Sequence, residues 1–380
     1  MSTLAFVNGR VIAEQGVLDR MTASVADGFV SGLKPLESGS GEVVDLEGGW
    51  LVPGFVDTQV NGGGGVLFND DVGVDAIAAI GAAHAPYGTT AFLPTLISDE
   101  LSASAKALDA VDAAIEVGIP GVVGVHLEGP FLNPLRKGVH EERHFRRLDP
   151  AIIELLSRPR RGVVMVTLAP ELCGPGDVAA LAAAGVRVSA GHTDATYDQM
   201  TEAMDEGLVA VTPLFNAMSP LHHRDLGVVG AALESGRLWC GLIADGAHVH
   251  PGGLRLALRS VPPERLMLVT DAMPSVGAAS KNFVLQGKAI TVVDGIPTGP
   301  DGTLAGSDLD MAQAVQNMVG MAGASVEAAV AMAAANPSAF LGVTAERGAI
   351  SVGRRADWVW LDEGLRPRET WIGGRRVSSA

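Results

Sequence analysis

The sequence predicts an α/β protein, a TIM-type (β/α)8 barrel with a small β-sandwich domain built from both termini. A chain of 380 residues is long enough for a barrel of about 250 residues plus an accessory module. Its central segment alternates apolar runs with Ala-rich helical stretches, as repeated strand-then-helix units do. Polar residues stand at the carboxyl ends of these apolar runs, which is where a barrel gathers its active site.

Both ends of the chain consist of short β-rich runs separated by Gly, Asp or Asn. At the amino end these runs are residues 4–13, 24–34 and 42–48, and at the carboxyl end they are residues 350–362 and 370–377. We therefore expect residues 1–51 and 346–380 to share one small β-sandwich. Residues 52–345 then form the barrel as an insertion between the two ends.

The central segment supplies the expected strands and helices of the barrel. After the run LVPGFVD, which ends at Asp57, strands are expected at residues 121–128, 162–169, 185–192, 208–212, 237–245 and 265–271. Helices are expected near residues 73–86, 99–117, 149–157, 176–184, 196–206, 251–260, 308–322 and 326–335. Because the strands are continuously apolar, they should be buried on both faces, which favours a parallel sheet.

Composition excludes several classes of protein. The formal charge of −16, with no long Lys/Arg cluster to offset it, argues against a nucleic-acid surface. Two cysteines, Cys173 and Cys240, cannot make a disulfide framework and indicate a reducing compartment. No apolar stretch approaches the roughly 20 residues that a membrane span needs, and Arg10 interrupts the amino-terminal run. We expect a soluble, cytoplasmic protein without nucleic-acid or membrane partners.

Chemically active residues stand at the ends of the predicted strands. They are Asp57, Glu128, His192, Asp245 and Asp271. A doubly wound sheet also places ligands at strand ends, but it usually carries a G-x-G-x-x-G loop, and the run NGGGG at residues 61–65 lacks that spacing. The barrel is therefore favoured over a dinucleotide-binding fold.

Glu128 in HLEGP and His192 in AGHTDAT end two of these strands and would converge on one point. A carboxylate oxygen and an imidazole nitrogen suit Zn²⁺ or a similar divalent ion. Each residue also has a structural interpretation. Glu128 could make a simple hydrogen bond, and His192 could be a core histidine beside a helix capped by Thr193 or Asp194.

Asp271 in VTDAMPSVG follows another buried run. A carboxylate beside a cation can accept a proton from water and later return it to a leaving amine. The structural alternative is an N-cap of the next segment.

At this point the chain resembles the N-acetylglucosamine-6-phosphate deacetylase family of the amidohydrolase superfamily. The motifs that carry the resemblance occur in the expected order: LVPGFVDTQVNGGGGVLFND, HLEGPFLN, KGVH, AGHTDAT, FNAMSPLHHRD, DGAHVHP, VTDAMPSVG and GTLAGSDLDM. They cover essentially the whole chain. The resemblance implies a TIM-type barrel with a small β-sandwich, usually a homodimer, that removes acetate from an amino sugar phosphate.

The resemblance also implies roles for individual residues. Glu128 and His192 match metal ligands, Asp271 matches the catalytic acid/base, and His140 matches the histidine that contacts the acetamido carbonyl. Gln59 matches a glutamine typical of members that use one divalent metal, so one ion is expected, Zn²⁺ first and Fe²⁺, Co²⁺ or Mn²⁺ as alternatives. Matching substrate-binding positions are Gln59, Asn61, His140, Asn216, Ala217, Arg224, His248 and Leu304, with Arg224 reaching the sugar phosphate in the partner subunit.

Pro213 breaks the family pattern. The family usually has a histidine at this place as its third protein ligand, and proline has no side-chain donor atom. Catalytic zinc ordinarily keeps about three protein ligands. Either His126, His222 or His223 completes the shell, or metal binding is weak, or the chain is an inactive paralogue that keeps sugar-phosphate recognition.

The predicted function is hydrolysis of the acetamide of N-acetylglucosamine 6-phosphate to glucosamine 6-phosphate and acetate. Metal-activated water attacks the carbonyl, Asp271 acts as base and then acid, and His140 stabilises the oxyanion. The rivals are a metal-poor or inactive sugar-phosphate-binding protein and an amidohydrolase for another N-acyl amine.

Overall fold

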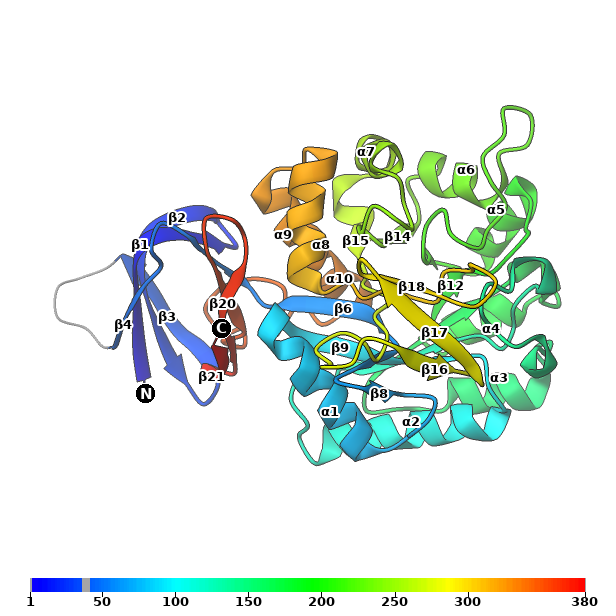
Figure 1. The fold of residues 1–380 in the computed structure, drawn as a ribbon, viewed down its shortest axis with the longest axis horizontal. Coiled ribbons are helices and arrows are strands. Elements are labelled where there is room, and N and C mark those ends of the chain that lie inside the picture. Colours follow the sequence, from blue (N-terminus) through cyan, green and yellow to red (C-terminus); the bar gives the residue numbers. More distant parts are fainter. Residues whose placement is uncertain (1, 36–41, 380) are drawn as a thin grey trace.

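The computed structural model describes residues 2–35 and 42–379 and contains a barrel beside a separate β-sheet (Figure 1). Eight parallel strands form the barrel, each hydrogen-bonded to the next: β6 (Phe55–Val60), β9 (Thr89–Ile97), β10 (Gly124–Glu128), β11 (Val163–Leu168), β12 (Arg187–Ala190), β13 (Ala210–Val211), β14 (Trp239–Leu242) and β15 (Leu266–Leu268). The chain just after β15 closes the ring, because Ala272 pairs with Val60 and the amide of Asp271 donates to the carbonyl of Gln59 at 3.0 Å. The predicted (β/α)8 barrel is confirmed.

Helices surround the strands. They are α1 (Val74–His84), α2 (Leu101–Glu116), α3 (Pro150–Ser157), α4 (Asp177–Ala183), α5 (Tyr197–Glu206), α6 (Gly227–Glu234), α7 (Pro251–Ser260), α8 (Met311–Asn317), α9 (Val326–Ala333) and α10 (Ala335–Leu341). Apolar side chains between these helices and the strands make the largest core of the protein. Phe340 and Leu341 of α10 pack with Val56 and Met267 near the amino ends of the strands, so the opposite end is left for a site.

The prediction was wrong about part of the barrel. It omitted β9, whose run TTAFLPTLI contains a proline. Proline in a central strand removes a ladder hydrogen bond, so such a run is an atypical central strand. In the structure Pro94 lies opposite Val60, where the register between β6 and β9 shifts, so the missing N–H falls at an interrupted part of the ladder. Helices α6 and α10 were also omitted, and the helix expected at 308–322 is divided between α8 and a π-helical turn at Met318–Ala322.

The two ends of the chain form one sheet, as predicted. Its strands are β1 (Ser2–Ala13), β2 (Gly16–Ala26), β3 (Phe29–Pro35), β4 (Glu42–Asp45), β5 (Trp50–Pro53), β19 (Trp358–Leu361), β20 (Pro367–Ile372) and β21 (Arg375–Ser379). Phe6 from the amino end meets Trp358 and Trp371 from the carboxyl end edge-on, with ring centroids 5.4 and 6.3 Å apart. This shared core joins the termini. The domain limits 1–51, 346–380 and 52–345 stay a prediction, and residues 36–41 lie outside the described residues.

A small three-stranded sheet, coloured yellow in Figure 1, is inserted between β15 and α8. It consists of β16 (Phe283–Leu285), β17 (Lys288–Val293) and β18 (Ile296–Thr298). The side chain of Gln286 donates to the carbonyl of Ser98 at 2.9 Å and accepts from the amide of Glu141 at 3.1 Å. The inserted sheet therefore lies over the carboxyl end of β9 and the loop that follows β10. The remaining short pair is β7 (Gly62–Gly63) with β8 (Val66–Leu67).

No helix in residues 2–35 or 42–379 is long and apolar enough to cross a membrane. The expected cytoplasmic location stays a prediction.

Candidate active site

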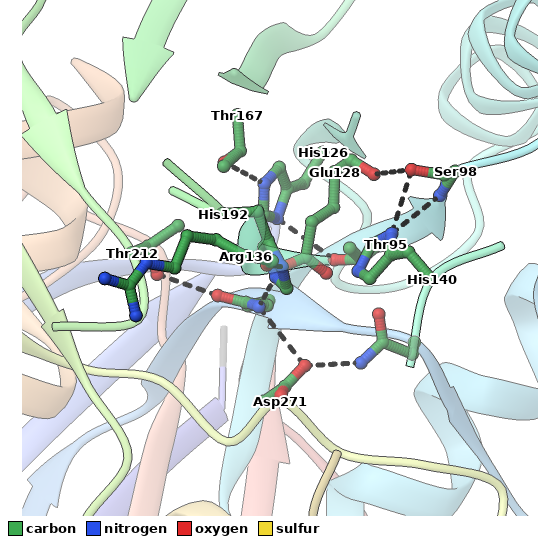
Figure 2. Close-up of polar contacts among 12 residues, drawn as sticks. Thr95, Ser98, His126, Glu128, Arg136, His140, Thr167, His192, Thr212 and Asp271 are labelled. Carbon is green, nitrogen blue, oxygen red and sulfur yellow. Dashed lines mark hydrogen bonds and ion pairs between the residues drawn. The ribbon is translucent and has the colours of Figure 1, made fainter. Parts of the chain in front are cut away.

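A cavity of about 380 Å³ opens at the carboxyl ends of the barrel strands. The predicted site residues that line it are Asn61, Glu128, His140, His192, Asn216, Ala217, His248, Asp271 and Leu304. Figure 2 shows the side chains of Glu128, His140, His192 and Asp271 pointing into one region. Two predicted residues are placed differently. Gln59 lies fully buried beneath the lining, and Arg224 is exposed on a loop outside it.

Glu128 and His192 meet, as their positions at strand ends predict. Glu128 is the last residue of β10, His192 follows β12, and the Glu128 Oε1 and His192 Nε2 atoms are 3.4 Å apart. His192 has a left-handed backbone (φ 49°), and its Nδ1 lies 2.9 Å from the carbonyl of Arg136. This carbonyl can only accept, so Nδ1 carries a proton, and Nε2 is the ring nitrogen that faces Glu128.

This pair fits a metal ion. Two ligands bound at 2.0–2.1 Å to a tetrahedral ion lie about 3.4 Å apart, which is the separation found here. A backbone carbonyl that fixes the second nitrogen of a histidine is the usual support of a histidine ligand. Burial alone would raise the pKa of Glu128, but the hydrogen bond from His192 and the nearby imidazoles lower it to about 2, so Glu128 stays ionised. Burial lowers the pKa of His192, yet Glu128 raises it overall.

The helix-capping alternative for this segment does not hold. Thr196, rather than Thr193 or Asp194, is the N-cap of α5, and it forms a reciprocal capping box with Gln199. Thr193 donates instead to Glu171 at 2.5 Å, and Asp194 forms an ion pair with Arg136 at 2.8 Å. Neither Thr193 nor Asp194 therefore caps the helix.

His140 lies beside this pair, with its ring centroid 4.4 Å from that of His192. Its Nδ1 is held by Ser98, 2.9 Å from the hydroxyl and 3.3 Å from the backbone amide. An amide N–H can only donate, so Nδ1 accepts and the proton sits on Nε2, which is then a donor. Burial and the nearby His192 lower the pKa of His140 to about 3, so the ring is neutral.

Asp271 lies in the same region of the cavity (Figure 2). Its Oδ1 accepts from the side-chain amides of Asn61 at 2.6 Å and Gln59 at 3.2 Å. Gln59 also donates to Glu128 at 3.0 Å, while its own oxygen accepts from Thr212 at 2.7 Å. Burial and the charge of Glu128 raise the pKa of Asp271 to about 7. Gln59 thus bridges the two carboxylates from beneath the cavity. The pKa of Asp271 is close to the value that suits a general base.

Pro213 lines the cavity, so the position of the missing histidine is next to the site. The substitutes considered from sequence lie elsewhere. His126 is buried between Thr95 and Thr167, and the adjacent rings of His222 and His223 are on the exposed loop that carries Arg224. Among the described residues, the one group of three metal-type donors is Glu128, His140 and His192, whose candidate atoms lie within 4.8 Å of one another.

Two other acids that the sequence placed at strand ends have supporting positions, and for Asp57 that placement was wrong, because it lies inside β6 (Phe55–Val60). Asp57 is fully buried and accepts from the hydroxyl of Thr270 at 2.5 Å, so it lies beneath the cavity. Asp245 accepts from Nδ1 of His248 at 2.6 Å and from two backbone amides of its own loop. Burial lowers the pKa of His248, but the Asp245 carboxylate raises it overall. Asp245 therefore orients a cavity residue.

Sequence reasoning missed Ser98 and Arg136. Ser98 follows β9, the omitted strand, and would have been found with it. Arg136 lines the cavity and supplies the carbonyl that holds His192, but a backbone contact leaves no signature in sequence.

The fold and this site define a class of protein. The chain matches the amidohydrolase family over residues 50–377, and it belongs to that family. It is 38% identical over 377 residues to the N-acetylgalactosamine-6-phosphate deacetylase of Shewanella sp. (strain ANA-3), covering 98% of this chain and 95% of that one. It is 39% identical over 350 residues to the N-acetylglucosamine-6-phosphate deacetylase of Bos taurus, covering 88% and 84%.

Two solved structures of such deacetylases have the same fold as this chain. The crystal structure of N-acetylglucosamine-6-phosphate deacetylase from Pasteurella multocida superposes with a TM-score of 0.95 at 32% identity, covering all of both chains. The enzyme of Mycobacterium smegmatis, in a mutant form in complex with N-acetyl-D-glucosamine-6-phosphate, superposes with a TM-score of 0.90 at 31% identity, covering 100% of this chain and 99% of the other.

Proposed function

We propose that this protein hydrolyses N-acetylglucosamine 6-phosphate to glucosamine 6-phosphate and acetate. The observation that carries the proposal is the convergence of Glu128, His140, His192 and Asp271 on one cavity at the carboxyl end of the barrel. A barrel with this set is suited to amide hydrolysis, and the relatives named above are deacetylases of amino sugar phosphates. The same convergence favours an enzyme over a paralogue that only binds sugar phosphate.

Glu128 and His192 would hold one divalent ion, with Zn²⁺ expected first. Their 3.4 Å separation and the orientation of His192 support this assignment. The ion, when bound, supplies positive charge that lowers the pKa of a water molecule and polarises an acyl oxygen. Replacing the missing ligand tests the placement. Pro213→His should raise Zn²⁺ affinity at least about tenfold, since the loss of even an outer-shell partner of a metal ligand changes affinity by about 10- to 100-fold. Unchanged affinity would contradict the position of residue 213 in the metal shell.

The chain's own residues supply the proton transfers. Asp271, with its pKa near 7, takes a proton from the attacking water and returns it to the amine as the C–N bond breaks. His140 donates its Nε2–H to the carbonyl oxygen, which gains negative charge in the transition state. Ser98 keeps His140 in the tautomer that can donate. Gln59 and Asn61 hold Asp271 in place.

The sugar phosphate would occupy the side of the cavity formed by Asn216, Ala217 and His248, with Asn61 and Leu304 also contacting the substrate. His248, held by Asp245, is a donor suited to an anion. Arg224 projects from an exposed loop and would reach the phosphate in the partner subunit of a homodimer. That part of the proposal would be overturned if the protein were a monomer in solution, or if turnover by the Arg224→Ala variant still depended fully on the phosphate of the substrate.

One experiment tests the function most directly. Zinc content and acetate release are measured together, with N-acetylglucosamine 6-phosphate, its 4-epimer N-acetylgalactosamine 6-phosphate, and unphosphorylated N-acetylglucosamine. We expect acetate release that depends on metal and on the phosphate, with the gluco epimer preferred. Binding without acetate release in the zinc-loaded protein would indicate a sugar-phosphate-binding protein. Turnover indifferent to phosphate would indicate an amidohydrolase for another N-acyl amine. Preference for the galacto epimer would change the identity of the proposed sugar substrate and leave the proposed deacetylation as it is.

A further inference from the structure

The cavity has two chemically different walls. The polar wall follows β13 and β14 and contains Asn216, Ala217 and His248. The apolar wall contains Ile97 at the end of β9, Val139 after β10, and Leu285 of the inserted sheet. In the strand order of the barrel, β9 and β10 stand four places away from β13 and β14. In a ring of eight strands, four places is the opposite side, so the two walls face each other.

The reacting groups fix which wall meets which half of the substrate. His140, the donor to the carbonyl oxygen, is held by Ser98, the residue after Ile97, and it follows Val139. The carbonyl end of the amide is therefore on the apolar side. The amide nitrogen and its sugar point to the polar wall, where the phosphate contacts are placed. The acyl carbon chain is left facing Ile97, Val139 and Leu285.

The apolar wall also separates the cavity from a second space. A second small space, of about 20 Å³, lies next to the cavity, between the loop that carries His140 and the inserted sheet. The two spaces share Gly138, Val139, Leu285 and Thr303 in their linings. Leu285 and Ile290 of the inserted sheet are buried with Ile97 and Met273 in one apolar cluster. The second space is also lined by Lys288, Asp301 and Thr303, so the apolar surface offered to an acyl chain longer than acetyl is that of Ile97, Val139 and Leu285 in the main cavity.

We infer that this wall is an acyl subsite that takes chains of three and four carbons, so that the protein also hydrolyses the N-propionyl and N-butyryl amides of glucosamine 6-phosphate. The inference rests on the proposed deacetylase function. Water adds its oxygen to the acyl carbon, the C–N bond breaks, and the products are propionate or butyrate and the protonated amine. Each methylene buried in the subsite favours binding roughly fourfold, which offsets the cost of a fuller pocket.

The first test uses the unmodified, zinc-loaded protein and the series of N-acetyl-, N-propionyl- and N-butyrylglucosamine 6-phosphate. We expect kcat/KM for the butyryl substrate within about tenfold of that for the acetyl substrate. A rigid acetyl pocket would lose about 10- to 200-fold for each added methylene. A stepwise fall of that size would overturn the inference while leaving the deacetylase intact. Failure of all three substrates would instead overturn the proposed function.

The second test narrows the subsite. Leu285→Phe adds volume to the lining that the two spaces share. The butyryl-to-acetyl ratio of kcat/KM should then fall at least about tenfold, which is the lower limit of the discrimination expected when a pocket has no room for one methylene. Val284→Phe is the matched control, because Val284 is the neighbouring residue of β16 and is 58% exposed. Its ratio should stay at the wild-type value. Equal effects of the two variants would overturn the assignment of Leu285. Thermal melts check that both variants fold.

Discussion

Two layers of polar side chains lie inside the barrel, and they have different uses. The lower layer consists of Asp57 and His126 with their hydroxyl partners Thr95, Thr167 and Thr270. The upper layer consists of Gln59, Glu128, His192 and Asp271. Asp57 and Gln59 are two residues apart on β6, as are His126 and Glu128 on β10, so each pair points to the same side of its strand.

The difference between the layers is where their hydrogen bonds end. In the lower layer they end on other protein groups: Asp57 on Thr270, and His126 on Thr95 and Thr167. In the upper layer Glu128, His192 and Asp271 keep atoms that face the cavity. Burial raises the pKa of both Asp57 and Asp271 to about 7, so the same shift accompanies a structural carboxyl and a catalytic one. Access to the cavity, rather than a shifted pKa, distinguishes the functional layer.

The largest effect is expected at Asp271. Asp271→Asn removes the base while keeping the shape, and kcat should fall about 10³-fold, within the usual range for loss of a general base. Asp57→Asn is the matched change in the lower layer and should keep most of the activity. Steady-state acetate release measures both. Comparable losses in the two variants would show that the layers do not differ in function.

The next effect is expected at His140. His140→Ala should lower kcat about 100-fold through loss of the carbonyl donor. Zinc affinity, measured by chelator competition, should stay near the wild-type value, because Glu128 and His192 would hold the ion. A parallel loss of zinc affinity would instead indicate that His140 is the third ligand in place of the missing histidine. The geometry allows this, because the candidate ligand atoms of Glu128, His140 and His192 lie within 4.8 Å of one another.

A smaller effect, on stability alone, is expected in the lower layer. Thr167→Val keeps the side-chain shape but removes the partner 2.8 Å from His126 Nε2. Leaving this buried nitrogen unpaired should cost about 1–3 kcal/mol of unfolding free energy, measured by urea denaturation, with little change in kcat. Thr344→Val, at an exposed threonine, serves as the control and should be close to neutral. A large drop in kcat for Thr167→Val would place the lower layer in the reaction.

The smallest effect is a pH dependence. In the folded protein burial raises the pKa of Asp57 from 3.8 to about 7, so the folded state holds this proton more tightly than the unfolded chain. The stability it contributes is complete below pH 3.8 and is lost as the pH rises through 7. Between about pH 6 and pH 8 the wild-type unfolding free energy should fall by about 1.4 kcal/mol relative to Asp57→Asn. Parallel curves for the two proteins would mean that Asp57 is ionised throughout.

The sequence was sufficient for the features that depend on local pattern. Apolar runs closed by polar residues located seven of the barrel strands, and the turn-rich ends located the terminal sheet. The same pattern placed Glu128, His192 and Asp271 at strand ends, and the motifs drew attention to His140. Pro94 concealed β9, because the register shift that accommodates a proline belongs to the pairing of two strands and not to either run alone.

The sequence by itself therefore determined that Glu128, His192 and Asp271 stand at the rim of the barrel, since strand ends follow from periodicity and turn residues. Only the tertiary structure decided which of these groups face open space. Asp57 and Asp271 are the same residue type at similar positions on their runs, yet one is enclosed by Thr270 and the other borders the cavity. The reason is physical: depth in the barrel and the identity of hydrogen-bond partners depend on contacts between strands far apart in the chain, and periodicity within one strand carries no record of them.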